Sequence, residues 1–319
     1  MFLGIEIGGT KLQLGLGEGD GHLLELWRGA VDAAACGEGI RRQITTAIPE
    51  LLANAGIDRG QLRGIGVGFG GPTDDATQSV IKSHHIAGWD GFPLAAWLTD
   101  LAGLPIVICN DADVAGLAEA RFGAGKGLSP IFYITVGTGI GGGLIIGGEI
   151  YRGVGKGASE IGHFVVNYRD ENDGHCDGIL EQFSAGWGIA SRARAYLHSD
   201  HRGRRSSLQR LPHDQITTLQ VGAAAKAGDE YAKWIMEVAV NSLAEAIRQM
   251  ITLLCPRRIV IGGGVSLIGE ELFFAPLRRR VAEGAFEAFA GLTDIVPAAL
   301  GEEVVVHGAL ALARQKLGG

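Results

Sequence analysis

The sequence predicts an α/β fold with two domains, and three observations support this prediction. The chain has 319 residues, which corresponds to about two domains of ordinary size. Apolar segments typical of strands alternate with segments typical of amphipathic helices. A strand, a glycine turn and a second strand occur together twice, at residues 2–16 and 131–146, which indicates an internal duplication.

Both glycine turns have the features of a phosphate-binding loop. A turn without side chains lets its backbone N–H groups approach a bulky anion closely. The candidate contacts are the turn residues Gly8, Gly9, Thr10, Lys11, Gly137, Thr138 and Gly139. Two such loops, one in each domain, would hold a polyphosphate. Plain tight turns are the structural alternative, and Lys11 is either a phosphate contact or a solvated turn lysine.

The other elements follow the order of an α/β fold. Strands are expected at residues 64–68, 105–109 and 258–261. Helices are expected where apolar residues recur at helical spacing, at residues 37–55, 93–102, 114–122, 231–254 and 304–317. Strands that end in glycine or polar residues indicate ligand loops, because α/β proteins bind ligands at the carboxyl ends of their strands.

Asp111 lies at such a strand end, directly before an expected helix. A carboxylate in this position can accept a proton from a hydroxyl group. The N-cap of the following helix is the structural alternative, because aspartate is common there. Further along the chain, Glu160 and His163 are polar residues with no role in a hydrophobic core, which indicates a polar ligand.

Three later segments carry weaker signals. A glycine turn with Gly263 and Gly264 follows the strand expected at 258–261. We expect this turn to lead directly into a helix N-terminus, a site suited to phosphate or ribose. The segment 168–177 is expected to be a polar loop, and the basic segment 192–210 a solvated surface excursion.

Composition and charge limit the classes of partner. Hydrophobic residues make up 46% and charged residues 20% of the chain, enough for buried cores. A net charge of −7 and a pI of about 5.7 argue against nucleic acid or a membrane surface as a partner. The four cysteines are widely spaced, which favours a reduced, cytoplasmic protein. We also expect no secretory signal peptide and no membrane span.

Taken together, the motifs resemble those of the ROK family of sugar kinases and sugar-responsive repressors. This family belongs to the superfamily of hexokinase, actin and Hsp70 ATPases. The matching segments are GIEIGGTK (4–11), GFGGPTD (68–74), GW (88–89), NDA (110–112), VGTGIGGG (136–143), EIGH (160–163) and IGGGVS (261–266). Each motif alone is weakly specific, whereas their family order over nearly the whole chain is specific.

This resemblance implies two ribonuclease-H-like, actin-like ATPase domains with a cleft between them, formed by residues 1–118 with 305–319 and by residues 119–304. It also implies a glucokinase-type hexose kinase that uses ATP and Mg²⁺ and forms a sugar 6-phosphate. ATP would contact both glycine hairpins and the later turn at Gly263 and Gly264. The implied sugar contacts are Gly71, Asn110, Asp111, Glu160, His163 and Glu181. Asp111 would be the general base, and a homodimer is usual in the family.

One departure from the family pattern concerns zinc. The family usually carries the motif C-x-C-G-x-x-G-C-x-E after the EIGH segment. Its three cysteine positions are occupied here by Asn172, Gly174 and Ile179. Structural zinc needs four ligands, and the remaining donors supply at most three: His163, His175 and Cys176. We therefore expect no zinc.

Two further departures lie near the expected sugar site. His85 stands where many relatives have asparagine, and Ser159 stands where the family usually has glycine. Both suggest a changed substrate preference or a poorer kinase. His84 and His85 are also candidate metal ligands or surface residues. Metal binding is the least favoured of these roles, because neighbouring side chains need not converge.

Other functions remain open beside a glucose kinase. The acceptor could be an N-acetylhexosamine, either GlcNAc or ManNAc. The chain could also be a non-catalytic sugar-binding or sensing protein of the same fold, although Asp111 and both glycine hairpins argue against this. A repressor is disfavoured by the acidic charge and by a first hairpin that begins at residue 2, where such relatives carry a helix-turn-helix domain. The expected partners are a small-molecule sugar and ATP.

Overall fold

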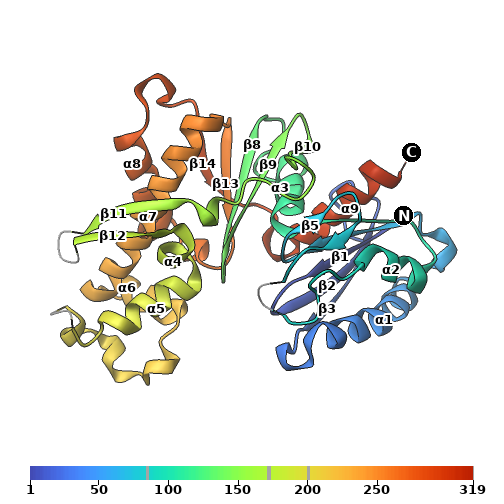
Figure 1. Ribbon diagram of the computed structural model, residues 1–319, viewed down its shortest axis with the longest axis horizontal. Helices are drawn as coiled ribbons and strands as arrows, with labels where there is room; N and C mark the ends of the chain where they lie inside the picture. Colours follow the sequence, from blue (N-terminus) through green and yellow to red (C-terminus); the bar gives the residue numbers. More distant parts are fainter. Residues whose placement is uncertain (84–85, 171–173, 200–201, 319) are drawn as a thin grey trace. The chain divides into compact units, whose positions relative to one another are not determined.

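The computed structural model describes residues 1–83, 86–170, 174–199 and 202–318 (Figure 1). The chain divides into two compact units. Unit 1 contains residues 1–133, 143–159 and 298–319, and unit 2 contains residues 134–142 and 160–297. The units are defined by compactness in space, which does not by itself give the limits of domains that fold independently. The domain limits stated above therefore stay a prediction.

The first sheet lies in unit 1 and has five strands in the order β3-β2-β1-β4-β7. Their bounds are β1 Phe2–Ile7, β2 Lys11–Gly17, β3 Glu25–Ala30, β4 Gly64–Phe69 and β7 Ile106–Asn110. Strand β2 runs antiparallel to both of its neighbours, β1 and β3, whereas β1, β4 and β7 run parallel to one another. Ile7 pairs with Phe69, and Phe69 pairs with Asn110. The carboxyl ends of three strands therefore meet at one edge of the sheet.

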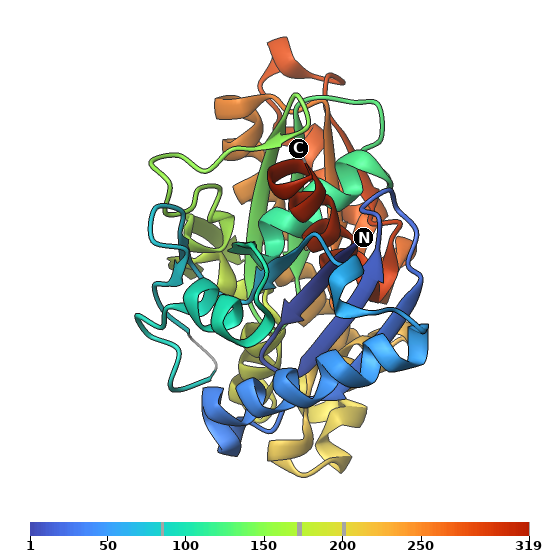
Figure 2. The same cartoon turned by 90° about the vertical axis from the view of Figure 1, so that its right-hand side faces the viewer.

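Helices cover both faces of this sheet. The helices α1 Cys36–Ala55 and α2 Leu94–Ala102 bury apolar side chains against one face, and both views place α1 beside the strands β1–β3 (Figures 1 and 2). The helices α3 Asp111–Arg121 and α9 Val304–Leu317 pack on the other face. Gly308 permits close packing of α9 on α3, because a Cβ atom there would lie 1.8 Å from the Val114 carbonyl oxygen.

The second sheet repeats the strand order of the first. Its order is β10-β9-β8-β13-β14, again third, second, first, fourth and fifth along the chain. The bounds are β8 Ile131–Val136, β9 Ile140–Ile146, β10 Glu149–Ile150, β13 Arg258–Gly262 and β14 Asp294–Pro297. The second strand of this hairpin begins at Ile140 rather than Leu144, so the glycines at 141–143 belong to the strand. The repeated order confirms the predicted α/β class and fits an internal duplication.

Unit 2 contains the long helix α7 Glu230–Leu254, around which shorter helices pack. These helices are α4 Leu180–Ser184, α5 Gly186–Tyr196, α6 Thr218–Lys226 and α8 Ala275–Gly284. The polar loop expected at 168–177 is wrong in part. The chain forms strands β11 Val165–Asp170 and β12 Gly174–Ile179, with Val165 paired to Ile179. Backbone hydrogen bonding sustains this hairpin although its sequence has no apolar alternation.

The basic segment 192–210 is not simply a solvated excursion. Its Leu197 and Leu208 side chains are buried. The Arg202 guanidinium lies 4.3 Å from the centroid of the Trp234 ring, in the geometry of a cation–π contact. Ser206 donates a hydrogen bond to the Asp229 carboxylate at 2.8 Å. The charges therefore flank a packed segment, which a count of basic residues does not reveal.

The remaining elements are short. Two two-residue strands, β5 Thr73–Asp74 and β6 Ser79–Val80, pair with each other. The 3₁₀ helices are Ala33–Ala35, Arg59–Gln61, Ile161–His163, Gly203–Arg205, Ser207–Arg210, His213–Gln215, Ser266–Ile268, Glu287–Phe289 and Gly301–Glu303, and a π-helical turn covers Glu270–Phe274. Within the described ranges, no helix combines the length and the apolar character needed to cross a bilayer.

Candidate functional site

The carboxyl edge of the first sheet brings the first glycine hairpin close to Asp111. The Gly70 N–H donates to the Ile7 carbonyl at 2.9 Å, and the Gly8 N–H donates to the Lys11 carbonyl at 3.1 Å to close the turn. A Cβ atom placed on Gly70 would lie 3.6 Å from the Gly8 Cα and 3.5 Å from Asp111 Oδ2. Unit 1 thus assembles a small-residue surface with a half-buried carboxylate beside it.

Asn110, not Asp111, is the N-cap of α3. The Asn110 side-chain oxygen accepts from the Ala112 N–H at 2.8 Å and from the Asp113 N–H at 3.3 Å. Its backbone is extended, whereas Asp111 is already the first helical residue, so the alternative role given to Asp111 is wrong. The Asn110 amide also donates to the Gly71 carbonyl at 3.1 Å. One side chain therefore caps the helix and binds the loop that follows β4.

Glu6 is a buried carboxylate at this edge that sequence reasoning missed. It is 5% exposed, and its Oε1 lies 3.2 Å from Lys11 Nζ. Burial raises the pKa of Glu6 to about 7; Lys11 opposes this rise, and the Asp111 and Glu302 carboxylates add to it. A glutamate inside the apolar strand FLGIEI was the available signal.

The Lys11 side chain is 39% exposed but is held by protein contacts, so it is not simply a solvated turn lysine. Its ammonium group donates to the Glu302 carbonyl at 2.9 Å in addition to its ion pair with Glu6. The side chain is therefore anchored at the hairpin, where it can offer positive charge to an anion.

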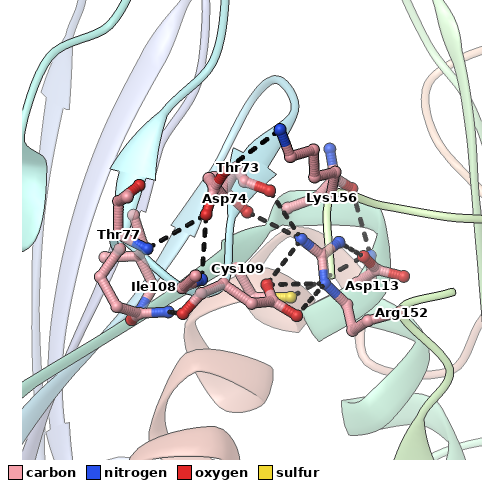
Figure 3. Close-up of polar contacts among 12 residues, drawn as sticks. Thr73, Asp74, Thr77, Ile108, Cys109, Asp113, Arg152 and Lys156 are labelled. Carbon is pink, nitrogen blue, oxygen red and sulfur yellow. Dashed lines mark hydrogen bonds and ion pairs between the residues drawn. The ribbon is translucent and has the colours of Figure 1, made fainter. Parts of the chain in front are cut away.

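A second group of polar side chains lies at the first turn of α3, and no pattern in the sequence pointed to it. Arg152 contacts Asp113 in the first turn of α3 and Thr73 and Asp75 in the β5 turn (Figure 3). Asp113 is 1% exposed. Residues so far apart in sequence have no periodic relation, so only the tertiary structure brings them together.

In unit 2, the second glycine hairpin contacts two other glycine segments. The Gly137 N–H donates to the Gly139 carbonyl at 2.9 Å, and the Gly186 N–H donates to the Gly137 carbonyl at 2.8 Å. Gly263 has a φ of +87°, and a Cβ atom there would lie 2.5 Å from the Val136 carbonyl oxygen. Only glycine fits this conformation and this approach. The structure thus places two predicted nucleotide-binding segments, the second hairpin and the Gly263 turn, side by side. The Gly186 segment, for which no ligand role was predicted, also contacts the hairpin.

The prediction of a helix directly after Gly264 is wrong. A single 3₁₀ turn, Ser266–Ile268, follows, and α8 begins only at Ala275 after the π-helical turn. The Ser266 hydroxyl donates to the Gly263 carbonyl at 2.7 Å and holds this tighter turn. An anion bound at this segment would therefore contact the N–H groups of the turn and not the N-terminus of a long helix.

Three of the polar residues predicted for the sugar, Glu160, His163 and Glu181, lie in unit 2. Glu181 Oε1 accepts from the Ile140 N–H at 2.6 Å, so this carboxylate binds the strand that leaves the hairpin. Glu160 precedes the 3₁₀ turn Ile161–His163, and the side chains of Glu160 and His163 are exposed. A Cβ atom at Gly162 would lie 2.3 Å from the Ile140 carbonyl oxygen, so this turn packs closely on the same strand.

Several predictions concern side chains that the structure does not describe. His84, His85 and Asn172 lie outside the described residues, and so do the side chains of His175 and Cys176. Among the residues that are described, no group of three or more His, Cys, Asp or Glu side chains could hold a metal ion. The absence of zinc therefore stays a prediction.

Comparison with known proteins gives a consistent result. A model of the ROK family matches residues 2–316. A glucokinase of Halalkalibacterium halodurans is 31% identical over 317 residues, which cover 99% of this chain and 95% of that protein. An N-acetylmannosamine kinase of Escherichia coli is 28% identical over 83% of this chain and 83% of that protein.

A solved structure also matches over the whole chain. The ROK family glucokinase from Streptomyces griseus, in complex with glucose and AMPPNP, has a TM-score of 0.79 and 30% sequence identity. The match covers 98% of this chain and 99% of that one. The predicted fold class, an α/β protein of the actin-like ATPase type, is thereby confirmed.

Proposed function

Because this chain belongs to the ROK family, we propose that it is a glucokinase-type hexose kinase that transfers the γ-phosphoryl group of ATP to the 6-hydroxyl of glucose. The broader class, an ATP-dependent sugar kinase, follows from the whole-chain matches to ROK glucokinases. The observation that carries the finer proposal is the position of Asp111. Its carboxylate lies beside Gly70 and the first glycine hairpin, where a general base is needed.

In the proposed reaction, Asp111 accepts the proton of the attacking sugar hydroxyl. The hydroxyl oxygen forms a bond to the γ-phosphorus, the bond between that phosphorus and the bridging oxygen breaks, and ADP leaves. The proton remains on the Asp111 carboxyl group until solvent takes it. Backbone N–H groups of the glycine turns stabilise the negative charge of the transferring group, since such donors need no reorganisation.

The proposed ligand contacts fall in both units. For ATP they are Gly8, Gly9, Thr10 and Lys11 in unit 1 and Gly137, Thr138, Gly139, Gly263 and Gly264 in unit 2. For the sugar they are Gly71, Asn110 and Asp111 in unit 1 and Glu160, His163 and Glu181 in unit 2. Fixed donors and acceptors of this kind discriminate sugars by their hydroxyl patterns.

Magnesium fits the chemistry of unit 1. Mg²⁺ prefers oxygen ligands, keeps several waters and binds through one or two carboxylates together with phosphates. Glu6 is 5% exposed and ion-paired with Lys11, so the half-buried Asp111, at the same edge, is the better placed of the two carboxylates and would hold the ion. When bound, Mg²⁺ would neutralise charge on the phosphates of ATP.

The test measures ADP release with MgATP across a panel of glucose, mannose, fructose, N-acetylglucosamine and N-acetylmannosamine. We expect turnover with glucose and a loss of about 10³-fold in Asp111→Asn, within the range for removal of a general base. Calorimetric binding of glucose and ATP should persist in the variant. Retained turnover in Asp111→Asn would remove this residue from the base role.

An N-acetylhexosamine kinase is the second candidate, and the similarity to an N-acetylmannosamine kinase supports it. Turnover confined to an N-acetylated sugar would favour it over the glucokinase. Binding without turnover for any sugar would favour a non-catalytic sugar-binding protein. A homodimer and a cytoplasmic location remain predictions of the family resemblance and the cysteine usage.

A further inference from the structure

Arg152 contacts two segments that carry proposed sugar-site residues. Its side chain is 12% exposed and lies in the segment after β10. Its Nη1 donates to Asp113 Oδ2 at 2.5 Å, and its Nη2 donates to the Thr73 carbonyl oxygen at 2.9 Å (Figure 3). Nη2 and Nε also donate to Asp75 Oδ1, at 2.9 and 3.1 Å. One planar group thus bridges the first turn of α3 and the β5 turn.

These contacts complete a closed path that passes through the backbone of Asp111. Asp113 lies two residues after Asp111, in the same first turn of α3. Thr73 follows Gly71 by two residues, and the Gly71 carbonyl accepts from the Asn110 amide at 3.1 Å. Asn110 in turn caps the helix that begins at Asp111. The loop after β4 and the start of α3 are therefore joined twice, by Asn110 and by Arg152.

The chemistry of this cluster suits an arginine. Asp113 is almost completely buried, and the Cys109 thiol lies 3.7 Å from its Oδ2. Burial raises the pKa of the Cys109 thiol, and the Asp113 carboxylate raises it further, so the thiol stays neutral beside the carboxylate. Arginine presents several donors in a rigid fork, whereas lysine is a point charge on a flexible stem. The fork binds Asp113 and Thr73 through two separate nitrogens, whereas a lysine would have to share one nitrogen between them.

We propose that Arg152 is a positioning residue for phosphoryl transfer, which holds the Asp111 carboxylate and the Gly71 loop in their mutual orientation. It does so through its hydrogen bonds to Asp113 and Thr73. A displacement of about 1 Å at a reacting group can cost on the order of 10²-fold in rate. This inference rests on the proposed function, because it assigns Arg152 a part in the same reaction.

The test compares Arg152→Gln and Arg152→Lys with the control Arg121→Gln. Arg121 is a half-buried arginine at the other end of α3, where it donates to the Gly148 carbonyl at 3.3 Å. We expect kcat to fall about 30- to 100-fold in both Arg152 variants, with KM for ATP changed less than about threefold. The control should keep its kcat within about twofold. A loss of kcat in Arg152→Lys, which keeps the charge, shows that the fork geometry matters.

A second variant tests whether the loss of kcat in Arg152→Gln comes only from misfolding. Arg152→Gln alone leaves the Asp113 carboxylate buried without its cation, so Arg152→Gln combined with Asp113→Asn removes both charges. The Asp75 N–H still donates to the Gly155 carbonyl at 2.8 Å, so the backbone keeps the two segments attached. The folded double variant should show the same fall in kcat as Arg152→Gln, because residues of one network are not additive. A double variant with the kcat of the wild type would overturn the proposal.

Amide hydrogen exchange separates this proposal from the proposed function. We expect faster exchange in peptides covering residues 70–75 and 108–113 of Arg152→Gln, and unchanged exchange in unit 2. Unchanged exchange in both peptides would overturn the positioning role whether or not the protein is a kinase. Faster exchange with wild-type kcat would also overturn it, because Arg152 would then be only structural. If the wild type turns over no sugar, the proposed function fails, and the part of Arg152 in that reaction is rejected with it.

Discussion

Glu6→Gln should change how the stability of unit 1 depends on pH. The substitution keeps the size of the side chain and removes its ionisation. In the folded protein, burial raises the pKa of Glu6 from an ordinary value of 4.5 to about 7. The ion pair with Lys11, at 3.2 Å, only partly offsets this effect. Folding therefore favours the protonated form of Glu6.

The sign and the size follow from this difference. Between about pH 4.5 and pH 7 the folded state binds more protons at Glu6 than the unfolded state does, so the free energy of unfolding falls as the pH rises. The contribution of Glu6 is fully present below about pH 4.5 and is lost as the pH rises through about 7. Each pKa unit corresponds to about 1.4 kcal/mol, which gives a total change of about 3 kcal/mol.

Urea unfolding followed by tryptophan fluorescence measures this effect. Three of the five tryptophans lie in unit 1: Trp27, Trp89 and Trp97. Replacing Trp187 and Trp234 by phenylalanine makes the signal report unit 1. The free energy of unfolding of the wild type, relative to that of Glu6→Gln, should fall by about 3 kcal/mol as the pH rises from about 4.5 to about 8.

The exposed carboxylate Glu38 provides the control, and Glu38→Gln should follow the wild-type pH dependence. If Glu6→Gln also ran parallel to the wild type over this range, the ion pair with Lys11 would fully compensate the burial of Glu6. The argument from burial would then be refuted. A difference of the opposite sign would mean that folding favours the ionised carboxylate.

Three further predictions concern stability and metal content. Gly308→Ala should destabilise unit 1 by roughly 3 kcal/mol in thermal unfolding, because its Cβ would lie 1.8 Å from the Val114 carbonyl oxygen; an unchanged Tm would contradict close packing of α9 on α3. Asp229→Ala should cost about 1–2 kcal/mol in urea unfolding of unit 2, since Asp229 caps α7 and accepts from Ser206 and Ser207; Asp214→Ala, an exposed site, serves as its control. Elemental analysis of protein purified without chelator should find far less than one zinc per chain, and a stoichiometric content would show that the 172–179 segment binds zinc after all.

Local patterns in the sequence were sufficient for most elements of the fold. The apolar run from Phe2 to Ile7 and the helical spacing from Tyr231 to Leu254 correspond closely to β1 and α7. Residues next to each other in sequence decide such elements, because strand and helix periods are local properties. The glycine turns were recognisable for the same reason.

Contacts between distant segments could not be obtained in this way. Asp75, Asp113 and Arg152 have no common period, yet they form one cluster in unit 1. The choice of Asn110 over Asp111 as N-cap depended on where β7 ends, because either side chain can cap a helix. The β11–β12 pairing likewise rests on backbone hydrogen bonds, which the side-chain pattern of a polar segment does not predict.

The sequence by itself thus indicated the glycine turns that are proposed to contact phosphate and the carboxylate, Asp111, that follows a strand. Glycine at a turn and aspartate at a strand end have the same chemistry in any context. The pKa of Glu6 depends instead on how completely the tertiary structure removes it from water, and on the nearby Lys11 and Asp111 charges. Burial and distance between remote residues exist only after folding, so the electrostatics of the site belong to the tertiary structure.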